Sequence, residues 1–289
     1  MTLRSRKAIA GFTLIEAVVA IVITGIVAGI VAVFIAKPVQ GYADSVRRAE
    51  LTDVADVALR RMARDVRLAL PNSLRTVASG FEFVMTKSGG RYRDGGDGST
   101  CGNFLYTTDV DCTPGVETAS ELDFDVLGPM PAITGGDRIV VYNLGAGYAP
   151  ADAYGGGNVA TVAGAAAITA NPVPLSANPF PAQSPPLPSP ASRFQVVDAA
   201  DLVVRYTCSG GMLTRFAGCS LASPSDCTVV GARASVLAGS AAVAASCSID
   251  YSSAVTGRSG LLLVSLTLTD AASGESATLV QQIHVDNAP

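Results

Sequence analysis

The sequence predicts an α+β fold in which one long N-terminal helix packs on a head built from an antiparallel β-sheet. Helical periodicity up to residue 71 and period-two alternation after residue 72 carry this prediction. The chain has 289 residues, of which 49% are apolar and 15% charged, and it lacks Trp, so we expect an aliphatic core. Its net charge of −4 argues against a nucleic-acid partner, because binding phosphates needs a basic excess or a basic patch.

An apolar run at residues 12–36 predicts a single transmembrane helix. It has 25 residues, and Glu16 is its only ionisable side chain. A helix of this length spans about 37 Å, which is enough for a hydrocarbon core of about 30 Å. The run is longer than the apolar region of a secretory signal peptide. Three basic residues precede it, so the positive-inside rule places residues 1–11 in the cytoplasm and residues 37–289 across the membrane. These basic residues are Arg4, Arg6 and Lys7.

The start of this run reads Gly11-Phe12-Thr13-Leu14-Ile15-Glu16 and resembles the signal of type IV pilins and type II secretion pseudopilins. The resemblance implies that residues 1–11 are a leader, that a prepilin peptidase cleaves between Gly11 and Phe12, and that Phe12 is then N-methylated. A carboxylate in hydrocarbon costs roughly 2.5–3.5 kcal/mol, so we expect Glu16 to have a function and a partner that offsets this cost. The family suggests that it pairs with the mature amino terminus of a neighbouring subunit during filament assembly. The alternative is that Glu16 lies near the lipid headgroups and stays hydrated.

Residues 37–71 predict an amphipathic continuation of the helix on the periplasmic side. One face is apolar or small, with helical spacing. The opposite face carries a run of charges that is either solvated or a surface for a partner pilin. We expect Pro38 to kink or locally open the helix and Pro71 to end it. The apolar positions are Leu51, Ala55, Ala58, Met62, Val66 and Ala69, and the charged positions are Arg47, Arg48, Glu50, Asp53, Asp56, Arg60, Arg61, Arg64, Asp65 and Arg67.

Residues 72–289 predict a periplasmic head of short strands separated by turns. Residues 270–274 are typical of a hairpin turn between the last two strands. The predicted strands are Thr76–Thr86, Glu121–Leu127, Arg138–Asn143, Arg193–Val197, Leu202–Cys208, Cys247–Tyr251, Gly260–Asp270 and Glu275–Val285.

Residues 145–190 stand apart by composition. The first part is rich in Gly and Ala, and residues 171–190 contain eight of the chain's 16 prolines. We expect a long excursion outside the core, extended and partly polyproline. It is either low-complexity surface or a site for a partner or ligand.

All six cysteines follow the apolar run and would therefore lie in the oxidising periplasm. We favour the pairs Cys101–Cys112, Cys208–Cys247 and Cys219–Cys227, with Cys219 and Cys227 in a loop between strands. The alternative for the last four is Cys208–Cys219 with Cys227–Cys247. The cysteine spacing lacks a C-x2-C pair, so we expect no metal site.

No pattern in the sequence points to catalysis or to a cofactor, and we expect neither. His284, the only histidine, is expected in a strand and has no G-x-S-x-G motif beside it. Residues 93–98 have acids and glycines but do not fit the calcium-loop template, so we interpret them as a turn. Walker and Rossmann glycine motifs are missing, so an assembly ATPase would be another protein.

The head also resembles, in part, the MshO-type minor pilins of mannose-sensitive haemagglutinin (MSHA) pili. The similar segments are Arg67–Arg75, Arg258–Leu261 and Gln282–Pro289; residues 90–190 are not covered. The resemblance implies a minor pilin that primes, assembles or caps a pilus, with its head in the periplasm before it enters the fibre. Its partners would be other minor and major pilins, the prepilin peptidase, and the inner-membrane platform with its ATPase. The alternatives are a J-type minor pseudopilin of type II secretion and a pilus-associated adhesin whose site is the proline-rich excursion.

Overall fold

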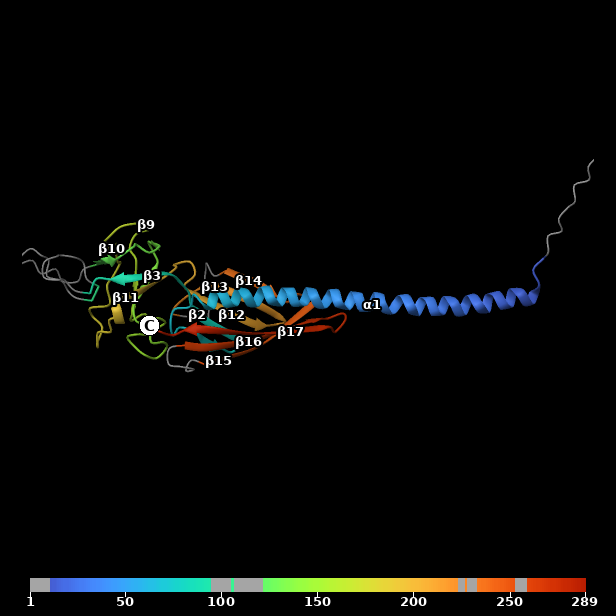
Figure 1. The fold of residues 1–289 in the computed structure, drawn as a ribbon. Helices are drawn as coiled ribbons and strands as arrows, with labels where there is room; N and C mark the ends of the chain where they lie inside the picture. Colours follow the sequence, from blue (N-terminus) through green and yellow to red (C-terminus); the bar gives the residue numbers. More distant parts are fainter. Residues whose placement is uncertain (1–10, 95–104, 107–121, 223–226, 228–232, 253–258) are drawn as a thin grey trace, which may run out of the picture. The chain divides into compact units, whose positions relative to one another are not determined.

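The computed structural model describes residues 11–94, 105–106, 122–222, 227, 233–252 and 259–289. The chain divides into two compact units, Met1–Glu50 and Leu51–Pro289. Helix α1 (Leu14–Val66) begins in the first unit and ends in the second (Figure 1). The remaining elements are strands of the second unit and one short 3-10 turn, so the predicted α+β class is confirmed.

Within the first unit, the described large apolar side chains of α1 are exposed from Leu14 to Val46. By length and composition, α1 can cross a membrane. The helix continues through Pro38, so the expected local opening is wrong. A proline removes its own N–H donor, but the flanking i→i−4 bonds can remain in place.

The helix ends at Val66, before Pro71, because the following backbone bonds to the sheet instead. The Leu68 carbonyl accepts from Thr86 N at 2.7 Å, and Leu70 N donates to Val84 O at 2.8 Å. These bonds draw residues 67–70 out of the helix, so the predicted end at residue 71 is about one turn too late. Ala69, expected on the buried helical face, instead forms a bridge with Met85.

The last four turns of α1 pack on the first sheet through the predicted apolar face. Leu51, Ala55, Ala58, Met62 and Val66 are all buried. They share one core with aromatic side chains of the sheet, Phe81, Phe83 and Tyr206. The sheet has the order β1-β2-β12-β13-β14, and β2, β12 and β13 run beside the C-terminal part of α1 (Figure 1). Its strands are β1 (Arg75–Val77), β2 (Gly80–Val84), β12 (Val203–Ser209), β13 (Met212–Cys219) and β14 (Arg233–Ala238).

A three-stranded sheet closes the same core. It has the order β15-β16-β17, with β15 (Val243–Ser252), β16 (Ser259–Asp270) and β17 (Ser276–Asp286). Alternate residues of β16, from Leu262 to Leu268, are fully buried. The predicted hairpin turn is present: Asp270 Oδ1 accepts from Ser273 N at 2.7 Å, and Gly274 has φ +72°.

A second sheet and core contradict the prediction that residues 145–190 lie outside the core. Val162, Val173, Leu175 and Phe180 are buried beside the side chains of Phe124 and Phe194. Prolines and glycines weaken strand signals, but the apolar residues between them still reach the core. The sheet has the order β5-β3-β11-β7-β8, and β10-β4 and β6-β9 form separate pairs. These elements are β3 (Thr86–Tyr92), β4 (Asp123–Phe124), β5 (Val126–Leu127), β6 (Ile133–Thr134), β7 (Arg138–Val140), β8 (Val159–Thr161), β9 (Ala167–Ile168), β10 (Val173–Pro174), η1 (Pro190–Ser192) and β11 (Arg193–Val197).

Tyrosines shielded from solvent make the free energy of unfolding of the head depend on pH in the alkaline range. Burial raises the pKa of Tyr92, Tyr106, Tyr154 and Tyr206 above 10.0, and the charge of Asp65 raises that of Tyr206 further. Above pH 10.0 the folded chain therefore binds more protons than the unfolded chain, so stability is retained below this pH and falls as pH rises through it.

We expect the melting temperature of the full chain in detergent to fall by several degrees between pH 8 and pH 11. Tyr206→Phe should weaken this pH dependence, because it removes one buried phenol. Tyr148→Phe, at an exposed position, should leave the pH dependence unchanged. Equal melting temperatures of the unmodified chain at the two pH values would contradict the argument.

Candidate functional site

The segment singled out by the sequence lies at the start of α1. Gly11 and Phe12 precede the helix, and Thr13 is the N-cap residue. Ala17 N donates to Thr13 O at 3.1 Å, and Glu16 N donates to Thr13 Oγ1 at 3.4 Å. Thr13 and Glu16 thus have the spacing of a capping box. We did not single out Thr13, although the T-x-x-E pattern could have revealed it.

Glu16 lies in the first turn of α1, where a negative charge is favourable beside the free N–H groups of the helix. Its side chain is exposed in the single chain, as is the apolar side chain of Phe12. Among the described residues of the first unit, an exposed carboxylate in the first turn of α1 and the exposed apolar side chain of Phe12 just before it therefore lie close together in sequence. This geometry suits contact with another molecule, and the partner of Glu16 stays a prediction.

A buried polar cluster fixes the other end of α1 to the sheet. Asp65 Oδ2 accepts from Tyr206 Oη at 2.7 Å and from Arg215 Nε at 2.6 Å. Burial alone lowers the pKa of Arg215, but the hydrogen bond and charge of Asp65 outweigh burial and raise it. We predicted Asp65 on the solvated face of the helix, and this is wrong. Its position, one step from the apolar stripe, puts its carboxylate within reach of an inward-facing arginine on β13.

The described part of the head contains two disulfides. Cys208 on β12 bonds Cys247 on β15 and so joins the first sheet to the three-stranded sheet, with Cα atoms 6.0 Å apart. Cys219 bonds Cys227 with Cα atoms 4.7 Å apart. This is the pairing favoured from the sequence, but Cys219 ends strand β13 and does not lie in a loop. Cys101 and Cys112 lie outside the described residues.

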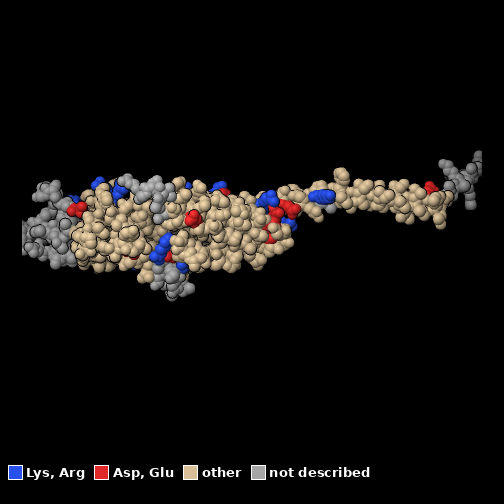
Figure 2. All heavy atoms as spheres, turned by 90° about the horizontal axis from the view of Figure 1, so that it is seen from below, with Lys and Arg blue, Asp and Glu red and all other residues tan. Residues whose placement is uncertain are grey.

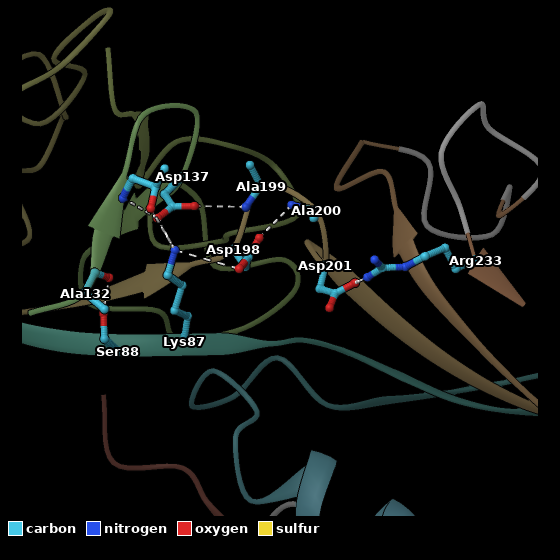
Figure 3. Close-up of polar contacts among 10 residues, drawn as sticks. Lys87, Ser88, Ala132, Asp137, Asp198, Ala199, Ala200, Asp201 and Arg233 are labelled. Carbon is cyan, nitrogen blue, oxygen red and sulfur yellow. Dashed lines mark hydrogen bonds and ion pairs between the residues drawn. The ribbon is translucent and has the colours of Figure 1, made fainter. Parts of the chain in front are cut away.

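A second polar cluster joins the strands of the other sheet (Figure 3). Lys87 Nζ donates to Asp137 Oδ2 at 2.8 Å and lies 3.8 Å from an oxygen of Asp198. The buried Asp137 also accepts from Thr134 N at 2.8 Å and from Ala199 N at 3.2 Å. Both carboxylate oxygens of Asp137 accept hydrogen bonds, so this cluster holds β3, the start of β7 and the turn after β11 together. Figure 3 also shows the ion pair between Asp201 and Arg233.

The residues considered for catalysis and metal binding are not brought together. His284 is exposed on β17, opposite Leu261 of β16. No group of three or more His, Cys, Asp or Glu side chains in the described part of the chain is placed to hold a metal ion. Most of the predicted turn at residues 93–98 lies outside that part.

Comparison with known families matches the N-terminal segment. Residues 6–32 match the family described as the prokaryotic N-terminal methylation motif. No curated protein and no solved structure matches the chain. The chain therefore carries a methylation motif of the type found in prepilins, at the start of a helix that is apolar enough to cross a membrane.

Proposed function

We propose that this chain is a minor type IV pilin of the MshO kind, which helps to prime, assemble or cap an MSHA-type pilus. The methylation motif at residues 6–32 carries the proposal. The fold supports it, because the motif opens a 53-residue helix whose far end is fixed to a disulfide-bonded β head. Such a chain can be anchored in the inner membrane by one end of α1 while it presents the head in the periplasm.

Processing would convert the precursor into the working subunit. The prepilin peptidase would cleave after Gly11 and methylate Phe12, both of which lie outside the helix. The cut removes Arg4, Arg6 and Lys7, so the mature chain keeps 17 basic and 24 acidic residues and has a net charge of −7. The new amino terminus would then be available to pair with Glu16 of an adjacent subunit.

Two of the segments that carry the MshO resemblance contact each other in the head. Asn72 N donates to Asn287 Oδ1 at 3.2 Å, and Asn72 Nδ2 donates to Asn287 O at 3.1 Å. Asn72 also donates to Asn143 O at 2.9 Å, so the segment after the helix, the C-terminal segment and the loop after β7 meet here. The similar sequences are therefore parts of one junction in the head.

The alternatives differ in which system the subunit serves. A J-type minor pseudopilin of type II secretion would use the same processing. A dedicated adhesin would use the proline-rich segment, but that segment contributes buried side chains to a core, which favours a structural role. We propose no enzymatic activity and no cofactor. The partners would be other pilins, the prepilin peptidase, the assembly platform and its ATPase.

Deletion of the gene and counting of surface pili test the proposal. We expect at least a tenfold loss of pili, restored by the unmodified chain. Pili of normal number that no longer bind their target would instead indicate an adhesin. Normal piliation with loss of protein secretion would indicate a pseudopilin, and either result would overturn the MSHA assignment.

A further inference from the structure

The disulfide between Cys208 and Cys247 lies beside an open hollow in the head. This hollow has a volume of about 260 Å³ and is lined by both cysteines, by the region of the turn between β1 and β2, and by Ile249 of β15. Both cysteines are partly buried, because they pack against the core that α1 shares with the first sheet and also line the hollow. A solute in the hollow can therefore reach the bridge while the head stays folded. The lining residues of the turn region are Thr76, Val77, Ala78, Ser79 and Gly80.

The surroundings of the hollow do not oppose a negatively charged nucleophile. The nucleophile in disulfide exchange is a thiolate, and an acidic side chain at the site would repel it. None of the residues that line the hollow is charged. Most of the head surface that is visible in Figure 2 is uncharged as well. A thiolate can therefore approach the bridge without meeting a like charge among the lining residues.

The bridge between Cys219 and Cys227 is less open to the same reaction. Cys227 lines a separate hollow of about 290 Å³, but Cys219 is fully buried in a different apolar core. Attack on the sulfur of Cys227 would expel a Cys219 thiolate into the protein interior, where an ionised group loses its hydration at a high cost. In the Cys208–Cys247 bridge both cysteines line the hollow, so the leaving thiolate can be hydrated. The two bridges should therefore differ in their rates of exchange.

The Cys208–Cys247 bridge links the two sheets that enclose the core beneath α1. Cys208 lies on β12 of the first sheet, and Cys247 lies on β15 of the three-stranded sheet. Hydrogen bonding also joins this part of the head, since Ala245 N of β15 donates to Gly211 O at 2.8 Å. Opening the bridge removes a covalent link between the sheets but leaves this hydrogen bond in place. The redox state of the bridge can therefore change the stability of the head without unfolding it.

We propose that the Cys208–Cys247 bridge of the folded head is a thiol-exchange site on which a thioredoxin-type dithiol protein acts. One thiolate of the dithiol bonds to one sulfur of the bridge, and the other sulfur leaves as a thiolate and takes up a proton. The second thiol of the dithiol then attacks the mixed disulfide. Cys208 and Cys247 together gain two electrons and two protons, and the dithiol is oxidised to a disulfide. The same steps in reverse close the bridge again.

The site suits a protein dithiol better than a small thiol. Strand β1 ends the first sheet, and the exposed residues Thr76, Ala78 and Ser79 lie next to the bridge. An extended segment of a partner protein can pair with the backbone of such an edge strand. A dithiol also completes both exchange steps in one encounter, whereas a small thiol needs two encounters. The inference goes beyond the proposed function, because it needs the folded head and not a pilus.

Trapping with a single-cysteine thioredoxin tests the proposal. In this probe a serine replaces the second active-site cysteine, so the mixed disulfide is not resolved. The full chain, oxidised and folded in detergent, is incubated with the probe, quenched with acid and mapped by mass spectrometry of its peptides. We expect about tenfold more adduct on Cys208 and Cys247 together than on Cys219 and Cys227 together. In denaturant this preference should disappear, because both bridges are then exposed.

A bulky residue in the turn provides a second measurement that leaves every cysteine in place. Ala78→Trp should narrow the hollow and lower the yield of adduct on Cys208 and Cys247 by about threefold or more. Ala272→Trp, at an exposed position in the turn between β16 and β17, is the matched control and should leave the yield unchanged. Equal yields from the two variants would contradict access through the hollow.

The distribution of adduct in the folded chain decides the outcome. Preference for Cys208 and Cys247 supports the exchange site. Adduct that is absent from these two residues, or spread equally over the four cysteines of the two bridges, would overturn it. Peptides with Cys101 or Cys112, which lie outside the described residues, are scored separately. The expected preference in a chain whose deletion leaves the number of pili unchanged would support this inference and reject the proposed function alone.

Discussion

Asp65→Ala is expected to destabilise the head by about 3 kcal/mol, because it removes the carboxylate that pairs with the Arg215 guanidinium on the inner face of the sheet. The side chains of Arg215 and Asp65 keep 11% and 15% exposure, so we take the low end of the range for a broken buried pair. Tyr206 loses its acceptor as well. A domain of this size should then melt about 6–12 °C lower. Thermal melting of the full chain in detergent measures this shift.

Asp56→Ala is the matched control, since it removes an ion pair on the exposed face of the same helix. The partner of Asp56, Arg60, is 72% exposed, so the expected change is about 0.5 kcal/mol or less. Equal shifts for the two variants would show that the buried cluster does not fix α1 to the sheet.

The second large effect is expected from Glu16→Ala. Cleavage after Gly11 should continue, but incorporation into pili should fall at least tenfold. The loss follows if the amino terminus of a neighbouring subunit is left without a counter-charge among apolar helices. Glu16→Gln should lose as much, because it keeps the size of the side chain but not the charge. Quantitative blotting of sheared pili against whole cells gives the incorporated fraction.

Thr13→Val separates helix capping from charge pairing. It removes the hydroxyl that accepts from Glu16 N but leaves the carboxylate in place. Loss of an N-cap costs about 1 kcal/mol, so we expect a smaller effect, at most about fivefold. If Glu16→Ala enters pili at the unmodified level, the pairing hypothesis is wrong.

Features set by local periodicity were predictable from the sequence. The apolar stripe of α1 from Leu51 to Val66 and the C-terminal hairpin around Asp270 follow from spacing alone, and both occur in the structure. Strand β11 also has the predicted bounds, Arg193–Val197. In α1 and in strand β16 of the hairpin, the buried side chains repeat with the period of the element.

Features set by distant contacts were not predictable. Strand β13 places Leu213, Arg215 and Ala217 on the inner face. The arginine interrupts the alternation of apolar and polar residues, and its burial depends on the ion pair with Asp65. Strand β3 has glycines at Gly89 and Gly90 where β11 packs against it, so it lacks an apolar signal. The core role of Phe180 likewise depends on residues far along the chain.

In the candidate site, too, local patterns were predictable and contacts between distant residues were not. The Gly11–Glu16 motif is a local pattern, and the family match at residues 6–32 covers it. The polar cluster around Asp65 and the junction of Asn72 with Asn287 join residues more than 100 positions apart, so no spacing rule could reveal them.

Mass spectrometry of the mature amino terminus, on protein from cells with active prepilin peptidase, tests the central claim most directly. The account predicts a chain of 278 residues that begins at an N-methylated Phe12. A Gly11→Leu variant should remain at precursor length, which shows that the peptidase makes the cut. An unmodified chain that still begins at Met1, or that is cut anywhere other than after Gly11, would contradict the account.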